Sequence, residues 1–329
     1  KLNFLPRQLW RSIVKNVATA LDSLVPERSR LRRVLRVIGR RVSPGLAYRL
    51  RANQFDSRDI RKPDPPGVTF QISFLDPEEP EVSIVVPTYG RLDLSLRCLK
   101  SLATAETKTS FEVILVDDAH GKATPPELGA ITGLRIIRNE TNIGFLGSAN
   151  IGAAMARGKM LLFLNNDTTV SDGWMDALMD CYRSHPGAGI VGPKILNLDG
   201  TLQDAGGRLF EDGSAINFGR GMPPGDHRVS FVRDADYISG SCLLIEQKLF
   251  NNLGQFDERF RPAYCEDSDL AMSVRRLGRR VLYCPASVVF HLEGGTHGRD
   301  IRAGVKRYQT LNQRRLYSKW ARTLKACGP

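Results

Sequence analysis

The sequence predicts an α/β fold in which helices cover both faces of a mostly parallel sheet. From Glu81 onward, short apolar stretches typical of buried strands alternate with stretches of helical periodicity. Strands and helices that alternate along a chain form parallel sheets with helices on both faces. The chain has 329 residues, 42% of them hydrophobic and 25% charged, so it can bury a substantial core.

The positions of the elements indicate where a site should lie. We expect strands over 82–87, 111–117, 134–138, 160–164, 237–245 and 281–291, and helices over 92–102, 150–157 (the end of a longer helix), 173–184, 268–277 and 302–325. Ligands bind beyond the carboxyl ends of the strands in such sheets. The residues just after the first strands should therefore line the site. They are Pro87-Thr88-Tyr89, Asp117-Asp118 and Asn165-Asn166-Asp167.

Charge divides the chain into three parts. Residues 1–62 hold 16 Lys and Arg against 4 Asp and Glu, residues 63–298 hold 22 against 30, and residues 299–329 hold 9 against 1. The three net charges are therefore +12, −8 and +8. We predict a basic amphipathic helical arm over 1–62, a Pro-rich connector over 63–80, an acidic main domain over 81–298 and a basic C-terminal helix over 299–329.

The basic arm is consistent with two interpretations. It suits an anionic membrane surface, where each basic residue near the headgroups adds about 1 kcal/mol. It equally suits a helical hairpin that packs on the main domain and keeps its arginines in water. Nucleic acid is not expected as a partner, because the basic tracts lack a recognisable binding motif.

Cysteine usage and hydropathy indicate the compartment. The six cysteines form no C-x-x-C pair, no run of about 18 apolar residues occurs, and no secretory signal pattern is present. We expect a cytoplasmic protein with reduced thiols, attached to the inner face of the cytoplasmic membrane if the arm binds lipid. The chain begins with Lys1, so we expect it to be trimmed or cut from a longer chain.

Three acidic clusters fall at the ends of predicted elements: Asp117-Asp118, Asn165-Asn166-Asp167, and Glu266-Asp267 with Asp269. Carboxylates beside a cleft can hold a hard divalent cation such as Mg²⁺ or Mn²⁺, which can clamp phosphate oxygens. Any one pair could instead cap a helix or lie in a solvated turn, as we expect for Asp172. A dinucleotide-dependent oxidoreductase and a P-loop kinase are excluded, because neither glycine-rich motif occurs.

Taken together, these motifs resemble those of the inverting glycosyltransferases of family 2, which have the GT-A fold. The resemblance covers residues 81–298 and rests on Val82-Ser-Ile-Val-Val-Pro-Thr-Tyr89, Val116-Asp-Asp118, Asn142-Ile-Gly-Phe145 with Asn150, Leu164-Asn-Asn-Asp-Thr168, Ser239-Gly-Ser241, and Glu266-Asp-Ser-Asp-Leu270 with Pro285 and His291. It implies a nucleotide-binding half over 81–170 and an acceptor half over 171–298.

The resemblance implies roles on the donor side. Pro87, Thr88 and Tyr89 would contact the nucleoside, Tyr89 by stacking on the base, and Asp118 would accept a hydrogen bond from the pyrimidine N–H of uridine or thymidine. Asn165-Asn166-Asp167 takes the place of the family's D-x-D metal motif, which leaves Asp167 as the principal metal ligand and His291 as a second ligand. Asn166 joins the nucleotide-sugar site. Backbone N–H groups of the turn at Asn142 and Gly144 could face the pyrophosphate, or the glycines could serve helix packing.

On the acceptor side, the resemblance makes Asp267 the base that removes the acceptor hydroxyl proton. We expect Asp267 to stay ionised because it lies near a helix N-terminus. Glu266 would orient Asp267 or hold the acceptor sugar, Asp269 would support the pocket, and Gly240 would line the acceptor side.

The resemblance to bacterial rhamnosyltransferases of surface polysaccharide assembly favours dTDP-rhamnose as the donor. UDP-galactofuranose, UDP-galactose and UDP-glucose remain alternatives, and the acceptor is expected to be a glycan or a lipid-linked glycan. The alternative from another class is a non-catalytic subunit that binds a sugar nucleotide or a glycan on the same fold. The loss of carboxylates from the metal motif suggests that alternative, whereas the presence of Asp167, Asp267 and His291 together speaks against it.

Overall fold

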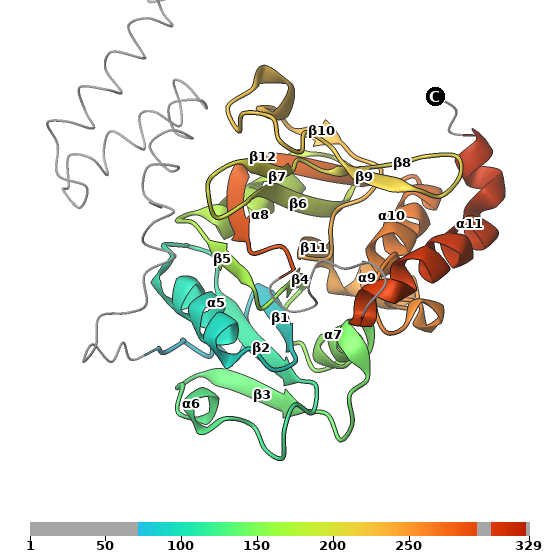
Figure 1. Cartoon of the computed structure of the whole chain (residues 1–329). Coiled ribbons are helices and arrows are strands. Elements are labelled where there is room, and N and C mark those ends of the chain that lie inside the picture. The colour runs from blue at the N-terminus through green and yellow to red at the C-terminus, as the bar shows by residue number, and fades with distance from the viewer. Residues whose placement is uncertain (1–71, 295–303, 327–329) are drawn as a thin grey trace, which may run out of the picture.

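The computed structural model describes residues 72–294 and 304–326, shown as coloured ribbon in Figure 1. The predicted arm over 1–62 and the first part of the connector lie outside the described residues. Within the described ranges, no helix is long and apolar enough to cross a membrane.

A central sheet of ten strands forms the body of the molecule (Figure 1). Eight strands follow the order β10-β12-β6-β11-β4-β1-β2-β3, while β5 pairs with β12 and β7 with β6. The bounds are β1 Val82–Thr88, β2 Phe111–Asp117, β3 Leu134–Arg138, β4 Met160–Leu164, β5 Thr168–Val170, β6 Ala188–Leu196, β7 Leu202–Asp204, β10 Arg233–Asp234, β11 Cys242–Glu246 and β12 Arg280–His291. A separate hairpin joins β8 Gly207–Leu209 to β9 Ala215–Asn217.

Helices cover both faces of this sheet, as the sequence predicts. They are α5 Leu92–Thr104, α6 Pro126–Gly129, α7 Gly144–Ala154, α8 Trp174–Ser184, α9 Gln247–Asn252, α10 Glu266–Arg276 and α11 Tyr308–Ala326, with single 3₁₀ turns η1 His227–Val229, η2 Glu258–Phe260 and η3 Gly304–Arg307. Buried side chains of α5, α6 and α8 join the apolar cluster on one face, and those of α7, α9, α10 and α11 join the cluster on the other.

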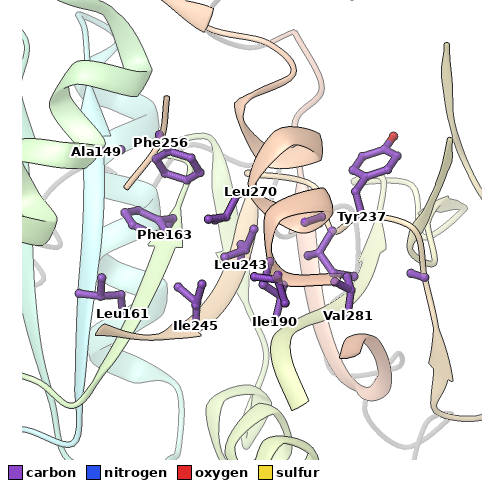
Figure 2. Close-up of a cluster of buried hydrophobic side chains, with 14 of the residues drawn as sticks. Ala149, Leu161, Phe163, Ile190, Tyr237, Leu243, Ile245, Phe256, Leu270 and Val281 are labelled. Atoms are coloured by element: carbon purple, nitrogen blue, oxygen red, sulfur yellow. The ribbon is translucent and has the colours of Figure 1, made fainter. Parts of the chain in front are cut away.

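Alternation along the strands divides the core between the two faces. In β4, Leu161 and Phe163 belong to one cluster, while Met160, Leu162 and Leu164 belong to the other. Successive side chains of a strand point to opposite faces, so a strand that is apolar throughout must be covered on both sides. Figure 2 shows the first cluster, in which Phe163 lies beside Phe256.

The one reversed strand in the centre of the sheet is β11. It pairs antiparallel with both β4 and β6, whereas β1 pairs parallel with β2 and β4. The sequence predicts this strand over 237–245, but it begins only at Cys242, because the N–H of Cys242 closes a turn onto the Ser239 carbonyl (3.2 Å). The start of β11 therefore lies beside the carboxyl end of β4, and residues from both halves of the sheet meet there.

Candidate functional site

A cavity of about 440 Å³ lies at this edge of the sheet. The residues that we predict for the site line it except Asp117 and Asp269; the Asp117 carboxylate accepts instead from the Thr124 hydroxyl (2.8 Å) and pairs with Arg138. The predicted residues that line it include Pro87, Thr88, Tyr89, Asp118, Asn142, Gly144, Asn166, Asp167, Gly240, Glu266, Asp267 and His291. The carboxyl ends of β1, β2, β4 and β12 and the N-terminus of α10 thus meet around one space, as expected for this type of sheet.

Tyr89 presents an open aromatic face at the end of β1. Its side chain is 45% exposed, and its ring meets the His120 ring edge-on, with the centroids 5.0 Å apart. An exposed aromatic ring that a second ring holds in place is a suitable stacking partner for a nucleobase.

Asp118 is buried and tied to the turn that opens α7. One carboxylate oxygen accepts from Asn139 Nδ2 (2.9 Å) and from the Ile143 N–H (2.8 Å), and the other accepts from the Gly144 N–H (2.8 Å). A carboxylate has about four acceptor sites, so Asp118 can still accept from a ligand. The Ile143 and Gly144 N–H groups, however, bind this carboxylate and do not face a pyrophosphate, contrary to that part of our expectation for the turn.

Asn166 holds two elements together beneath the cavity. Its Nδ2 donates to the hydroxyls of Thr88 (3.1 Å) and Ser95 (3.0 Å), which joins the end of β1 to α5. Its amide nitrogen is therefore used within the protein, where it fixes the Thr88 side chain at the edge of the cavity.

Asp167 and His291 are brought together by strand register. His291 lies opposite Thr168 in the antiparallel pair of β5 with β12, and Leu292 N–H donates to the Asp167 carbonyl (3.0 Å). Nε2 of His291 is 3.1 Å from Oδ1 of Asp167. The contact lacks hydrogen-bond alignment, so this buried Oδ1 has no hydrogen-bond partner among the described residues.

This pair fits a divalent cation. Adjacent ligands of an octahedral ion with bonds of about 2.1 Å lie about 3.0 Å apart, close to the observed separation of Nε2 and Oδ1. No cluster of three or more Asp, Glu, His or Cys side chains within the described residues is placed to hold a metal. Mg²⁺ and similar ions often take only one or two carboxylates and complete their shell with water and substrate phosphates. Two protein ligands beside an open cavity are therefore enough to bind such an ion when water and phosphate oxygens complete its shell.

Glu266 and Asp267 form a buried acid pair at the start of α10. Asp267 accepts from the Gly240 N–H (3.0 Å) and the Ser268 N–H (2.7 Å), whereas Oε2 of Glu266 has no partner in the described chain. Burial and the adjacent Asp267 carboxylate raise the pKa of Glu266 to about 8. Burial also raises the pKa of Asp267, and its hydrogen bonds oppose that effect. Our expectation from the helix N-terminus alone was incomplete, because burial outweighs it.

The two carboxyls of this pair differ in the hydrogen bonds that they accept. Donated hydrogen bonds favour the ionised form of a carboxyl, and burial without a partner favours the neutral form. The raised pKa of Glu266 therefore favours its protonated form at neutral pH, and the hydrogen bonds that Asp267 accepts oppose the rise in the pKa of Asp267.

A strained turn precedes this pair, and α11 supports it. Tyr264 and Cys265 both have left-handed backbones, with φ of 79° and 70°. Side-chain Nδ2 of the buried Asn312 in α11 donates to the carbonyls of Phe260 (2.6 Å), Ala263 (2.8 Å) and Tyr264 (3.1 Å). Consecutive left-handed residues other than glycine persist only where their surroundings hold them, and Asn312 supplies that support.

Asp269 does not line the cavity, which corrects our assignment of this residue to the acceptor side. Its carboxylate faces α11 and accepts from Trp320 Nε1 (2.6 Å) and Lys319 Nζ (2.8 Å). At 3.6 residues per turn, Asp267 and Asp269 lie about 200° apart around α10, so Asp269 points away from the cavity that Asp267 lines. Asp269 therefore anchors α11 to α10.

Several residues that line or support the cavity lie outside our predicted set, among them Tyr264, Lys306 and Gln203. Tyr264 and Lys306 line the cavity, and Gln203 contacts His291 from behind it, with Gln203 Oε1 2.7 Å from His291 Nδ1. The sequence gives a signal for Tyr264, because it lies two residues before Glu266 in the predicted acidic cluster. No local pattern marks Gln203 or Lys306, because each reaches the site only through tertiary folding.

Comparison with known proteins places this geometry in a family. Residues 83–254 match the family model described as glycosyl transferase family 2, which covers more than half of the chain. The O-antigen biosynthesis protein RfbC of Myxococcus xanthus is 30% identical over 261 residues, 76% of this chain and 20% of that protein. N-acetylglucosaminyl-diphospho-decaprenol L-rhamnosyltransferase of Mycobacterium tuberculosis is 27% identical over 241 residues, 66% of this chain and 78% of that protein.

A solved structure supports the fold. The crystal structure of GalNAc-T7 with UDP, GalNAc and Mn²⁺ aligns with a TM-score of 0.60 at 19% identity, over 75% of this chain and 50% of that chain. This chain thus spans a fifth of the Myxococcus protein and half of the GalNAc-T7 chain. With the matched segment, the ten-stranded sheet and the cavity at its carboxyl edge, the chain belongs to glycosyltransferase family 2 and has the GT-A fold.

Proposed function

We propose that this protein is an inverting glycosyltransferase that moves rhamnose from dTDP-rhamnose to a hydroxyl group of a glycan or lipid-linked glycan. The observation that carries the proposal is that one cavity holds both the Asp167–His291 pair and the separate acid pair Glu266–Asp267. The first pair suits a diphosphate with its cation, and the second suits removal of a proton from an acceptor.

Asp267 acts as the base. It takes the proton of the acceptor hydroxyl while the hydroxyl oxygen bonds to the anomeric carbon of the donor. The bond from that carbon to the diphosphate oxygen breaks, and its electron pair leaves with the nucleotide diphosphate. A single displacement of this kind inverts the anomeric configuration. The Gly240 and Ser268 N–H groups hold the Asp267 carboxylate in one orientation for this transfer.

Positive charge is needed where the diphosphate departs. Asp167 and His291 would hold Mg²⁺ or Mn²⁺, which supplies Lewis acidity toward the phosphate oxygens when bound. Lys306 lies among the residues that line the same cavity, and it adds a protein cation for the leaving group. Tyr89 and Asp118 orient the nucleoside on the other side, by stacking and by accepting a hydrogen bond from a pyrimidine N–H.

The donor and acceptor are proposed on two grounds. A pyrimidine with a protonated N3, as in dTDP and UDP, suits the acceptor oxygens of Asp118. The mycobacterial relative is named as a rhamnosyltransferase that acts on a sugar-diphospho-lipid, and this chain spans 78% of its length. The first ground favours a dTDP or UDP donor, and the second favours rhamnose as the sugar and a lipid-linked acceptor.

A donor screen tests the function. We would incubate the full chain with dTDP-rhamnose, UDP-galactofuranose, UDP-galactose and UDP-glucose, each with lipid-linked and free glycan acceptors, and detect products by mass spectrometry. We expect transfer from dTDP-rhamnose that a chelator abolishes. Transfer only from a UDP sugar would replace the donor assignment, and binding without transfer across the panel would support the non-catalytic alternative.

One substitution tests the base. We expect Asp267→Asn to leave dTDP binding near the wild-type level and to remove transfer, because the amide cannot accept the proton. Asp180→Asn is a matched control, since Asp180 is an exposed residue of α8 away from the cavity. Substantial residual transfer by Asp267→Asn would refute the assignment.

A further inference from the structure

A chain of hydrogen bonds connects the protein surface to His291. It begins at Asp199 and passes through Thr201, Asn197 and Gln203. Thr201 Oγ1 donates to Asp199 Oδ1 (2.6 Å), Asn197 Nδ2 to Thr201 Oγ1 (2.9 Å), and Gln203 Nε2 to Asn197 Oδ1 (2.8 Å), while Gln203 Oε1 is 2.7 Å from His291 Nδ1.

The direction of every bond in this chain follows from the carboxylate at its start. An ionised carboxylate only accepts, so the Thr201 hydroxyl uses its proton on Asp199 and accepts from Asn197. The Asn197 amide is thereby oriented with its oxygen toward Gln203. Gln203 Nε2 also donates to the main-chain carbonyl of His291 (3.2 Å). A reversed Gln203 amide would place its oxygen against two acceptors, so Oε1 must face the imidazole.

The chain therefore determines which imidazole nitrogen carries the proton. Because Gln203 Oε1 can only accept, Nδ1 of His291 must donate to it. In the neutral ring, the lone pair is then on Nε2, the atom that lies 3.1 Å from Asp167 Oδ1. A lone pair and a carboxylate oxygen cannot hydrogen-bond to each other, so both atoms are available as ligands of a cation.

We propose that Gln203 is a positioning residue that fixes His291 as the Nδ1–H tautomer and so presents Nε2 to the cation. The inference rests on the proposed function, in which His291 is a metal ligand. Gln203 is suited to the role because it is 3% exposed and lies in β7, which pairs with β6. A hydrogen bond from a partner to the second nitrogen is the usual way in which proteins orient a metal-ligating histidine.

The tautomer can be read directly by NMR of the metal-free full chain with ¹⁵N-labelled histidine, at a pH about two units above the ordinary imidazole pKa of about 6.5. The chain has five histidines, and the spectrum of His291→Asn assigns the signal of interest. His185 is an internal reference, because its Nδ1 lies 2.9 Å from the Cys181 carbonyl oxygen and must donate to it independently of Gln203.

We expect the wild type to show the Nδ1–H form of His291. Gln203→Leu removes the acceptor, so its His291 should convert to the Nε2–H form, which can donate to Asp167. Gln203→Glu keeps an acceptor oxygen and should keep the Nδ1–H form. The inference is overturned if His291 keeps Nδ1–H in Gln203→Leu, or if the wild-type ring is Nε2–H or doubly protonated.

Binding of Mn²⁺ gives the second readout, measured by electron paramagnetic resonance with UDP present. We expect Gln203→Leu to weaken Mn²⁺ binding by about 10- to 100-fold. Gln203→Glu should retain it, and so should the matched control Gln247→Leu, whose amide donates to the Ala156 carbonyl outside the cavity.

The two readouts separate this inference from the proposed function. If the wild type binds no Mn²⁺ while the tautomer still follows Gln203, the metal role in the proposed function fails and the positioning role of Gln203 stands. If His291→Asn weakens Mn²⁺ binding while Gln203→Leu does not, the metal role stands and the inference about Gln203 is wrong.

Discussion

Glu266 and Asp267 are neighbours in sequence with opposite surroundings. Asp267 accepts hydrogen bonds from two main-chain N–H groups, whereas Glu266 Oε2 is buried without a partner in the described residues. In the proposed mechanism Asp267 is the base; a base works best when its pKa lies near the working pH, and burial moves the pKa of Asp267 upward in that direction. The same burial makes Glu266 a neutral carboxyl that can donate a hydrogen bond to an acceptor sugar.

Burial of Glu266 predicts that the free energy of unfolding depends on pH. Its pKa rises from 4.5 in the unfolded chain to about 8 in the folded protein, so the folded state binds more protons between these pH values. Stability from this group is fully present below about pH 4.5 and is lost as the pH rises through about 8. We expect thermal denaturation to show that the wild type loses stability relative to Glu266→Gln across this interval. Parallel curves for the two proteins would contradict the assignment of the proton to Glu266.

Sequence reasoning found the residues that follow strands but missed those that act across the fold. Asp118, Asp167 and His291 follow or end apolar strands, so periodicity marks their positions. Gln203 and His291 are 88 residues apart, and their contact depends on the pairing of β7 with β6 and of β6 with β12. No local pattern carries that information.

Among the elements, α11 supports the 260–265 turn in addition to carrying positive charge. Leu316, Trp320 and Leu324 bury one face of this helix in the core, and Lys319 bridges Asp257 and Asp269. The charge distribution alone indicated only a basic helix. Its structural role became visible through Asn312, a polar residue buried at the interface with the 260–265 turn.

Asn312 should matter for stability and for turnover. Asn312→Leu leaves three carbonyls of the turn without their donor, which should cost at least about 2 kcal/mol. For a protein of this size we expect the melting temperature to fall by about 3 °C or more. Gln309→Leu, at an exposed position of the same helix, is the control and should change stability by less than about 0.5 kcal/mol. Equal melting temperatures of the two variants would show that Asn312 does not support the turn.

Strand β6 shows why part of the sheet could not be predicted. Its sequence, Ala188–Leu196, contains Gly192 and Pro193, residues that argue against a central strand. The structure accommodates Pro193 opposite Cys284, where the register of β6 with β12 shifts before Val288. At such an irregularity the ladder is already interrupted, so the missing N–H of proline costs little. The fold class and the strands β1 to β4 needed no such tertiary information.

At the scale of the whole molecule, one continuous sheet carries both halves of the site. The reversed strand β11 joins β4, which belongs to the predicted nucleotide-binding half, to β6, which belongs to the predicted acceptor half. Two lobes connected by a flexible segment could close around a substrate as rigid bodies. Two halves that share a sheet are joined by many main-chain hydrogen bonds, which would have to break before the halves could move in this way.

This continuity predicts a local response to ligands. We expect hydrogen exchange to slow at residues 88–90 and 142–146 when dTDP and Mn²⁺ bind, because these residues line or flank the cavity. Exchange of the β11 amides should stay unchanged, since no hinge crosses that strand. Faster exchange in β11 or β6 on binding would instead indicate that the two halves move relative to each other.

The contact between Gly144 and Pro262 limits how this protein can be recombined with its relatives. Gly144 has φ of +81°, and a methyl group at its Cα would lie 2.6 Å from Pro262 Cβ. Leu146 N–H also donates to the Pro262 carbonyl (3.2 Å). A chimera that takes the 255–265 loop from another member of the family would therefore have to take the start of α7 from the same protein. The two segments pack so closely that even one added methyl group would clash.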